Sequence, residues 1–102
     1  MGMRRDSRSM RSVRNLALMK AFAAELKARR SALAMSQEEL AHRCTVNRTY
    51  VAKLELAQNQ PSLSVLLKIS TGLEVELPEL IRLTLLRYGK EIRAAKRIGA
   101  QP

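Results

Sequence analysis

Two short helix patterns joined by a very short connection constrain the fold of this chain more than any other feature. Ser36 and Glu39 form an S-x-x-E capping box, which opens a helical pattern that continues to about residue 44. Asn47 is a second N-cap candidate, and the pattern that follows it extends to about residue 56. Because hardly any chain is left to turn between them, the two helices are expected to cross at a steep angle. The second helix is then held in front of the body, where it can enter the major groove of DNA.

The apolar residues of this segment fall on the faces that two crossing helices would bury. They are Leu40, Ala41 and Cys44 in the first helix, Val51 and Leu54 in the second, and Val46 in the turn. The outer face of the second helix carries four residues that can meet base edges: Arg48, Thr49, Ala52 and Lys53. Arg and Lys suit the acceptors of guanine, whereas Ala and the Thr methyl group suit the thymine methyl group. The alternative for the two basic residues is exposure to solvent or contact with phosphate.

Two more polar residues would flank a groove occupied by this helix. Asn47 and Tyr50 are therefore candidate phosphate contacts. Each also has a plainer explanation, because Asn47 can serve only as an N-cap and Tyr50 only as a half-buried packing ring.

The composition predicts one all-α domain with an aliphatic core. The chain has 102 residues, 3% aromatic residues, no Trp, four Gly and three Pro, and no stretch alternates strictly between apolar and polar residues. No apolar run approaches the roughly 20 residues of a membrane span, and the N-terminus lacks the apolar region of a signal peptide. The single Cys cannot form an internal disulfide, so we expect a cytoplasmic protein without membrane contact.

The net charge of +10 is concentrated at the two ends of the chain. Residues 1–20 and residues 82–102 each hold six basic residues and one acidic residue, whereas residues 21–81 are neutral overall. Basic segments of this kind usually contact polyanions, with nucleic acid as the leading candidate. The sequence thus predicts a basic N-terminal arm and helix extension (1–20), a DNA-binding domain (21–81) and the end of the last helix with a basic tail (82–102). Solvated tails that only aid solubility are the alternative.

Three further helices are expected outside the central pair. The first begins near Ser12 and ends near residues 32–34, and its first third is expected to lie outside the core as an extension. Pro61 opens another helix, which should bury Leu63, Leu66, Leu67 and Ile69. The last helix begins near Leu77 and gives way near Gly89 to a weakly helical basic tail. It carries more apolar residues than one small core needs, which favours a homodimer face or, alternatively, buried residues of a monomer: Leu83, Leu85, Leu86 and Tyr88.

With these residues in place, the stretch from about Phe22 to Ile81 resembles the Cro/repressor-type (Xre-like) helix-turn-helix family of bacteria and their phages. The resemblance rests on the following residues: Phe22, Leu26 and Arg30; Met35-Ser-Gln-Glu-Glu-Leu-Ala41; Val46; Arg48-Thr-Tyr-Val51; Leu54-Glu55; Pro61-Ser-Leu63; and Leu73, Val75, Leu77, Glu79 and Leu80. It implies a compact five-helix repressor-like domain that binds specific double-stranded DNA, usually as a dimer, in the cytoplasm at the bacterial or phage nucleoid. It also implies a phosphate contact for Gln37 and a partly buried ion pair between Arg30 and Glu55 that fixes the orientation of the recognition helix.

The chain departs from the family pattern at its turns. Family members often place Gly at four positions that carry other residues here: Ala34, Thr45, Ala57 and Glu74. If the backbone keeps a positive φ at these positions, each carries roughly 1 kcal/mol of strain. The loop of residues 56–60 also lacks the basic residue that the family often supplies for phosphate, and the tails are the expected replacement.

The sequence gives no support for catalysis or for a cofactor. His42 has no neighbours at metal-ligand spacing, and no catalytic set or glycine-rich phosphate loop is present. We therefore expect a transcriptional regulator without a metal site, and not an enzyme. An antitoxin that binds a partner toxin and regulates its own operon would keep the same DNA-binding domain, so it stays open as an alternative. A structural or RNA-binding protein that relies only on its basic tails would show no sequence preference.

Overall fold

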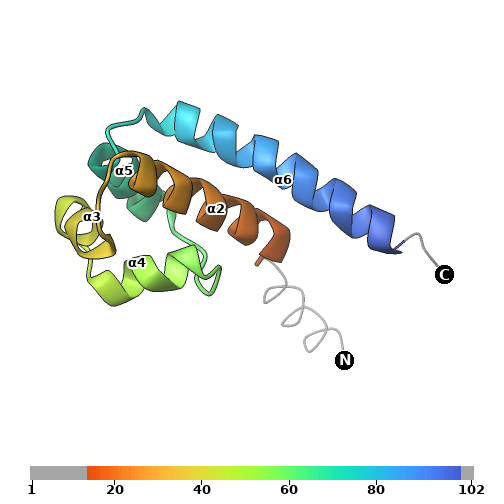
Figure 1. The fold of residues 1–102 in the computed structure, drawn as a ribbon, viewed down its shortest axis with the longest axis horizontal. Coiled ribbons are helices and arrows are strands. Elements are labelled where there is room, and N and C mark those ends of the chain that lie inside the picture. The colour runs from red at the N-terminus through yellow and green to blue at the C-terminus, as the bar shows by residue number, and fades with distance from the viewer. Residues whose placement is uncertain (1–13, 100–102) are drawn as a thin grey trace, which may run out of the picture.

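The computed structural model describes residues 14–99 and confirms the predicted all-α fold. Its five helices are α2 (Leu16–Ala32), α3 (Gln37–Cys44), α4 (Arg48–Glu55), α5 (Leu63–Gly72) and α6 (Leu77–Gly99) (Figure 1). Most of the predicted N-terminal arm, residues 1–13, and the last three residues of the predicted tail lie outside the described residues. None of the described helices is long and apolar enough to cross a membrane.

Side-chain caps explain where four of the helices begin. Asn15, Ser36, Asn47 and Ser62 each accept a hydrogen bond from the backbone N–H three residues later, at 3.0, 3.0, 2.7 and 3.2 Å. The predicted caps at Ser36 and Asn47 are thus confirmed. The carboxylate of Glu39 does not complete the capping box; it accepts from Arg43 at 3.2 Å.

All five helices contribute to one aliphatic core. Leu26, Leu40, Leu54, Ile69 and Leu80, one from each helix, are at most 1% exposed and belong to a single cluster. The predicted inner faces of α3 and α4 are part of it, with Ala41, Cys44 and Val51 also buried. Burial of this apolar surface is the main stabilising contribution, and it fixes α4 against the rest of the molecule.

Helix α2 lies between α4 and α6 and contacts both (Figure 1). The sequence predicts an extension outside the core at the start of this helix, but the helix begins at Leu16 and Met19 is only 3% exposed. The difference arises because α6 runs alongside α2 and covers its first turns. Two side-chain hydrogen bonds connect α2 and its N-cap to α6 in the described residues: Arg87 Nε donates to Glu25 Oε1 at 2.8 Å, and Asn15 Nδ2 donates to the Tyr88 hydroxyl at 3.2 Å.

The structure corrects two predictions about α5 and α6. Leu63 and Leu67 are 75% and 58% exposed, because the inward side of α5 carries Leu66 and Ile69 and leads to Leu73, the residue after the helix. The segment after Gly89 is not a separate, weakly helical tail, because α6 continues through it to Gly99. The backbone after Gly89 is therefore part of one continuous helix with the segment before it.

The four turns that lack Gly keep the left-handed backbone. Ala34, Thr45, Ala57 and Glu74 have φ values of 56°, 58°, 58° and 58°. In this region the Cβ of an L-residue is crowded by the following carbonyl group, at a cost of roughly 1–2 kcal/mol per residue. The turns have therefore not been reshaped to suit their side chains, and the fold retains the strain.

Candidate nucleic-acid interface

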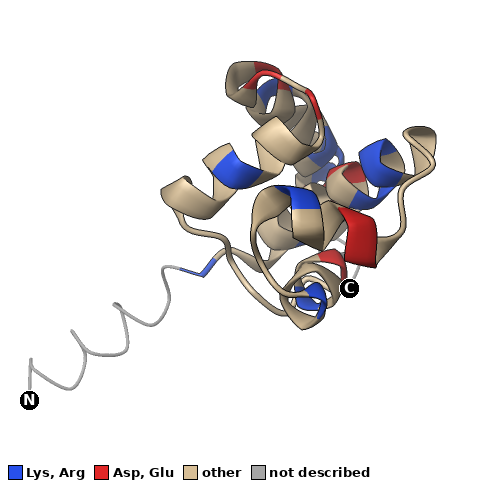
Figure 2. Cartoon of the chain, turned by 90° about the vertical axis from the view of Figure 1, so that its left-hand side faces the viewer, with Lys and Arg blue, Asp and Glu red and all other residues tan. Residues whose placement is uncertain are grey.

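The outer face of α4 is exposed and carries unpaired positive charge. Arg48, Thr49 and Lys53 are exposed and Ala52 is half-buried, so the structure brings the four predicted base-contact residues together on one face. Neither Arg48 nor Lys53 forms an ion pair with another residue in the described range 14–99. Figure 2, which views the molecule from the side of α3, shows both basic and acidic positions on the helices. The side chains of α4 are thus free to meet an anionic partner.

The inner face of α4 is held in place by the turn that precedes it. Val51 and Leu54 are each 1% exposed, and Val46 packs against the same core. The Val46 N–H donates to the carbonyl oxygen of Ala41 at 3.0 Å, across the left-handed residue Thr45. This short turn presents the outer face of α4 as a rigid surface, since α3 and α4 cannot separate without exposing core residues.

Asn47 and Tyr50 have the structural roles that the sequence left open. Asn47 is exposed, and its Oδ1 accepts from the Tyr50 N–H at 2.7 Å, as expected of an N-cap. Tyr50 is half-buried and packs against the core cluster. Both residues stand at the first turn of α4, beside the proposed base-contact residues.

Gln37, Arg30 and Glu55 form one polar cluster behind α4. Arg30 donates to both carboxylate oxygens of Glu55, from Nε at 2.6 Å and from Nη2 at 3.0 Å. Gln37 Nε2 donates to Glu55 Oε1 at 3.0 Å, and Arg30 Nη1 donates to the Met35 carbonyl oxygen at 2.7 Å. The ion-pair side chains are 13% and 4% exposed. The hydrogen bond to Glu55, with its negative charge, raises the pKa of Arg30 against the opposing effect of burial.

Arg14 is a basic residue beside this surface to which the sequence assigned no individual role. Its Nη2 donates to the carbonyl oxygen of Gln58 at 2.8 Å, and the adjacent Asn15 N–H donates to Gln60 Oε1 at 3.1 Å. These contacts place an exposed guanidinium group at the loop that follows α4. The loop itself has no basic residue. The contact joins residues 44 apart, so no local pattern indicates it. The only indication in the sequence is that the loop lacks a basic residue, so that another segment would have to supply one.

The described residues contain no group of three His, Cys, Asp or Glu side chains that could hold a metal ion. Cys44 is a free, buried thiol in the core between α3 and α5. Burial raises its pKa, although a hydrogen bond with the backbone of Gly72 acts in the opposite direction.

Comparison with known proteins gives a consistent result. A family model described as helix-turn-helix matches residues 26–80. The restriction-modification controller protein C.AhdI from Aeromonas hydrophila is 37% identical over 61% of this chain and 94% of its own, with a TM-score of 0.59. The C.Esp1396I controller, solved as a tetramer with its natural 35 base-pair operator, is 25% identical over 70% of this chain and 93% of its own, with a TM-score of 0.66.

A third solved structure is similar in fold alone. The clp gene regulator ClgR from Corynebacterium glutamicum is 21% identical over 82% of this chain and 87% of its own, with a TM-score of 0.70. No curated protein sequence matches the chain at a significant level.

Proposed function

The chain belongs to the Xre-like helix-turn-helix family of sequence-specific DNA-binding transcription regulators, and we propose that it reads its operator by inserting α4 into the major groove. The observation that carries this proposal is the contrast between the two faces of α4. One face is buried in the core through Val51 and Leu54. The other face presents Arg48 and Lys53, which have no ion-pair partner among the described residues. The family and the matched structures are DNA-binding regulators, not enzymes.

Base recognition is assigned to the exposed face of α4. Arg48 can donate two hydrogen bonds to the O6 and N7 atoms of guanine, and Lys53, one turn further along, can reach the same acceptors. Thr49 and Ala52 provide methyl groups for contact with thymine. The short side chain of Ala52 lets the helix approach the bases closely between the two longer basic residues.

Phosphate contacts are assigned to residues at the ends of this face. Gln37 uses one amide hydrogen on Glu55 and retains a second for a phosphate, beside the free N–H groups at the start of α3. Asn47 and Tyr50 would contact the backbone at the entry of α4. Arg14 would take the phosphate beside the loop after α4, where the loop itself offers no basic side chain.

The basic ends of the chain would add affinity that does not depend on sequence. Each phosphate neutralised by Lys or Arg releases counterions, so the contribution of these segments falls as salt rises. The N-terminal arm enters the described structure at Arg14, beside α4, which favours the arm as the stronger contributor. The basic residues of α6 lie across α2 from α4 and are better placed for a neighbouring stretch of DNA (Figure 1).

We also propose that two copies bind together, with α6 providing the contact. Leu85 and Leu86 on α6 are 50% and 56% exposed and fit such a role. Leu83 is only half-exposed, and Tyr88, predicted for the same face, is half-buried and accepts a hydrogen bond from Asn15 in its own chain. The tetramer of C.Esp1396I on its operator supports assembly on double-stranded DNA. The comparisons do not favour the antitoxin alternative over the regulator.

Selection of bound sites from a random double-stranded DNA pool tests the proposal. A regulator that reads bases through α4 should enrich one motif, and a two-fold repeat within it would support binding by two copies. An Arg48→Ala, Lys53→Ala chain should lose the motif while keeping weak binding to all DNA. If the sequences bound by the native chain were as random as the starting pool, the result would contradict sequence-specific binding.

A further inference from the structure

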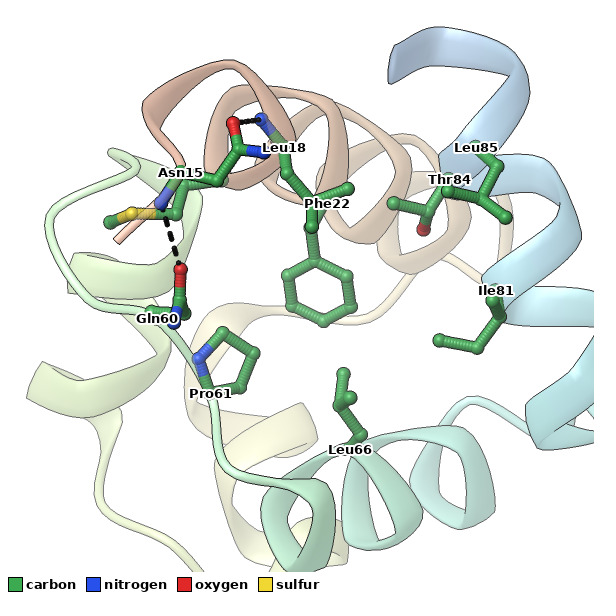
Figure 3. Close-up of a pocket in the computed structure, with 10 residues that line it drawn as sticks. Asn15, Leu18, Phe22, Gln60, Pro61, Leu66, Ile81, Thr84 and Leu85 are labelled. Carbon is green, nitrogen blue, oxygen red and sulfur yellow. Dashed lines mark hydrogen bonds between the residues drawn. The ribbon is translucent and has the colours of Figure 1, made fainter. Parts of the chain in front are cut away.

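A cavity of about 400 Å³ opens between the start of α2, the loop before α5, and α6 (Figure 3). Its walls include Phe22, Leu66, Ile81 and Leu85, and none of the residues that line it is charged. It is separate from the outer face of α4, none of whose residues takes part in the lining. The space is roughly two to three times the ~150 Å³ cavity that holds one benzene molecule. A ligand larger than a single ring can therefore be accommodated.

The cavity contains one buried polar group that nothing in the described chain satisfies. Thr84 is 4% exposed, and its hydroxyl has no hydrogen-bond partner among the described residues. Figure 3 shows this hydroxyl turned toward the hollow between Phe22 and Ile81. Most buried hydroxyl groups are hydrogen-bonded, because an unsatisfied one loses its bonds to water without replacement. The oxygen itself is closed to water, so a small rotation of the Thr84 side chain toward the hollow would let a group that enters the cavity provide the missing partner.

The rim of the cavity adds a second polar feature. Gln60 accepts from the Asn15 N–H at 3.1 Å, so two amide side chains stand beside an otherwise apolar opening (Figure 3). An apolar pocket with a few convergent polar groups is typical of small-molecule sites. The absence of charge from the lining disfavours anions and cations, which would lose hydration without compensation.

From these observations we propose that the cavity binds an uncharged, largely apolar small molecule with one hydroxyl or carbonyl oxygen, which hydrogen-bonds to Thr84. A second copy of the chain is a poorer fit as occupant. An apolar side chain from a helix laid across the opening could cover Leu85 but would leave the Thr84 hydroxyl without a hydrogen-bond partner. The proposal does not depend on the mode of DNA binding.

Two probes that differ only in a hydroxyl test the proposal on the full chain. The amide NMR spectrum is titrated with 4-propylphenol and, in parallel, with propylbenzene. Saturable shifts should appear at Asn15 and Thr84, and the phenol should bind more tightly. Thr84→Val keeps the shape of the side chain and should weaken phenol binding about three- to tenfold, while propylbenzene binding stays within about twofold.

A matched pair of variants separates the cavity from the apolar surface of α6. Leu85→Ala should weaken both probes because Leu85 lines the cavity, whereas Leu86→Ala, at a similarly exposed position outside the lining, should weaken neither. Absence of saturable shifts, or equal affinity of both probes for the native and Thr84→Val chains, would overturn the proposal. Binding that appears only when sedimentation shows dissociated chains would also overturn it, since the cavity would then belong to a protein contact.

Discussion

Gly72 of α5 lies so close to Cys44 of α3 that a Cβ atom on Gly72 would fall 2.5 Å from Cys44 Sγ. Real Cβ atoms do not approach other heavy atoms so closely, and both residues are buried, at positions where the core cannot expand freely. The close packing of α3 on α5 therefore requires both a glycine in one helix and a small side chain in the other.

Gly72→Ala should consequently destabilise the protein, although alanine favours helix formation. The expected loss is about 1–3 kcal/mol, the usual cost of overpacking a core. Adding Cys44→Ala removes the sulfur and should recover much of this loss, since the next neighbours of the added methyl group are 3.4 Å or more away. Urea unfolding of the two single variants and the double variant measures the coupling. Strictly additive losses would show that the sulfur contact is not the cause.

The left-handed turns also predict that glycine is more stable than alanine. Ala34→Gly and Ala57→Gly should each stabilise the fold by roughly 1 kcal/mol, because glycine adopts a positive φ without steric cost. The sites lie in different turns, so the gains should add. Ala28→Gly, at an exposed position inside α2, is the control and should lose up to about 1 kcal/mol. Thermal and urea unfolding would distinguish the two signs.

The ion pair behind α4 predicts a non-additive pair of substitutions. Glu55→Ala leaves Arg30 and the amide of Gln37 without their acceptor, and should cost about 3–5 kcal/mol. Replacing Arg30 and Glu55 together by Met and Leu should recover much of the loss, because no charge is then left unpaired. If the double variant lost as much as the two single variants combined, the pair would not act as a unit.

Arg48 and Arg14 should affect DNA binding in different ways. Arg48→Ala should cost about 1–3 kcal/mol on the selected site and relax the preference at one base pair. Arg14→Ala should weaken binding to all sequences and reduce the salt slope by about one, as expected for one lost phosphate contact. Arg82→Ala, on α6 and already paired with Glu79 at 2.8 Å, is the control and should change neither quantity. An unchanged slope for Arg14→Ala would remove it from the interface.

The buried thiol of Cys44 gives stability a pH dependence at the alkaline end. Burial raises its pKa above the ordinary value of 9.0, so the folded state holds the proton more tightly than the unfolded state does. The resulting stability is complete below pH 9.0 and falls as the pH rises through the higher value of the folded state. The free energy of unfolding should decrease more between pH 8 and pH 10 for the native chain than for Cys44→Ala. Parallel curves would contradict this reading.

The sequence predicted the features that depend on neighbouring residues. The caps at Ser36 and Asn47 and the inner positions of α3 and α4 follow from short-range spacing, and the structure contains all of them. The backbone at Ala34 and the other non-glycine turns could be predicted only conditionally. An L-residue in a turn does not itself reveal a positive φ.

The features that the sequence missed depend on contacts between distant parts of the chain. Burial of Met19 requires α6, and exposure of Leu67 depends on which stripe of α5 meets the core. The position of Arg14 beside the loop after α4 depends on a hydrogen bond to a residue 44 positions away. Helical periodicity identifies an apolar stripe, but it does not say which other helix covers each turn.

The position of α2 between α4 and α6 has a consequence for how the protein would bind as two copies. Glu25 joins α2 to Arg87 of α6, and Arg30, just over one turn further along, joins it to Glu55 of α4. Any contact that orients α6 in a pair of chains therefore also orients α4, because α2 is bonded to both helices. The distance between the two recognition helices, and with it the length of DNA between half-sites, would be set by the length and direction of this single helix. Lengthening or bending α2 should change the preferred spacing of an operator without changing the bases that are read.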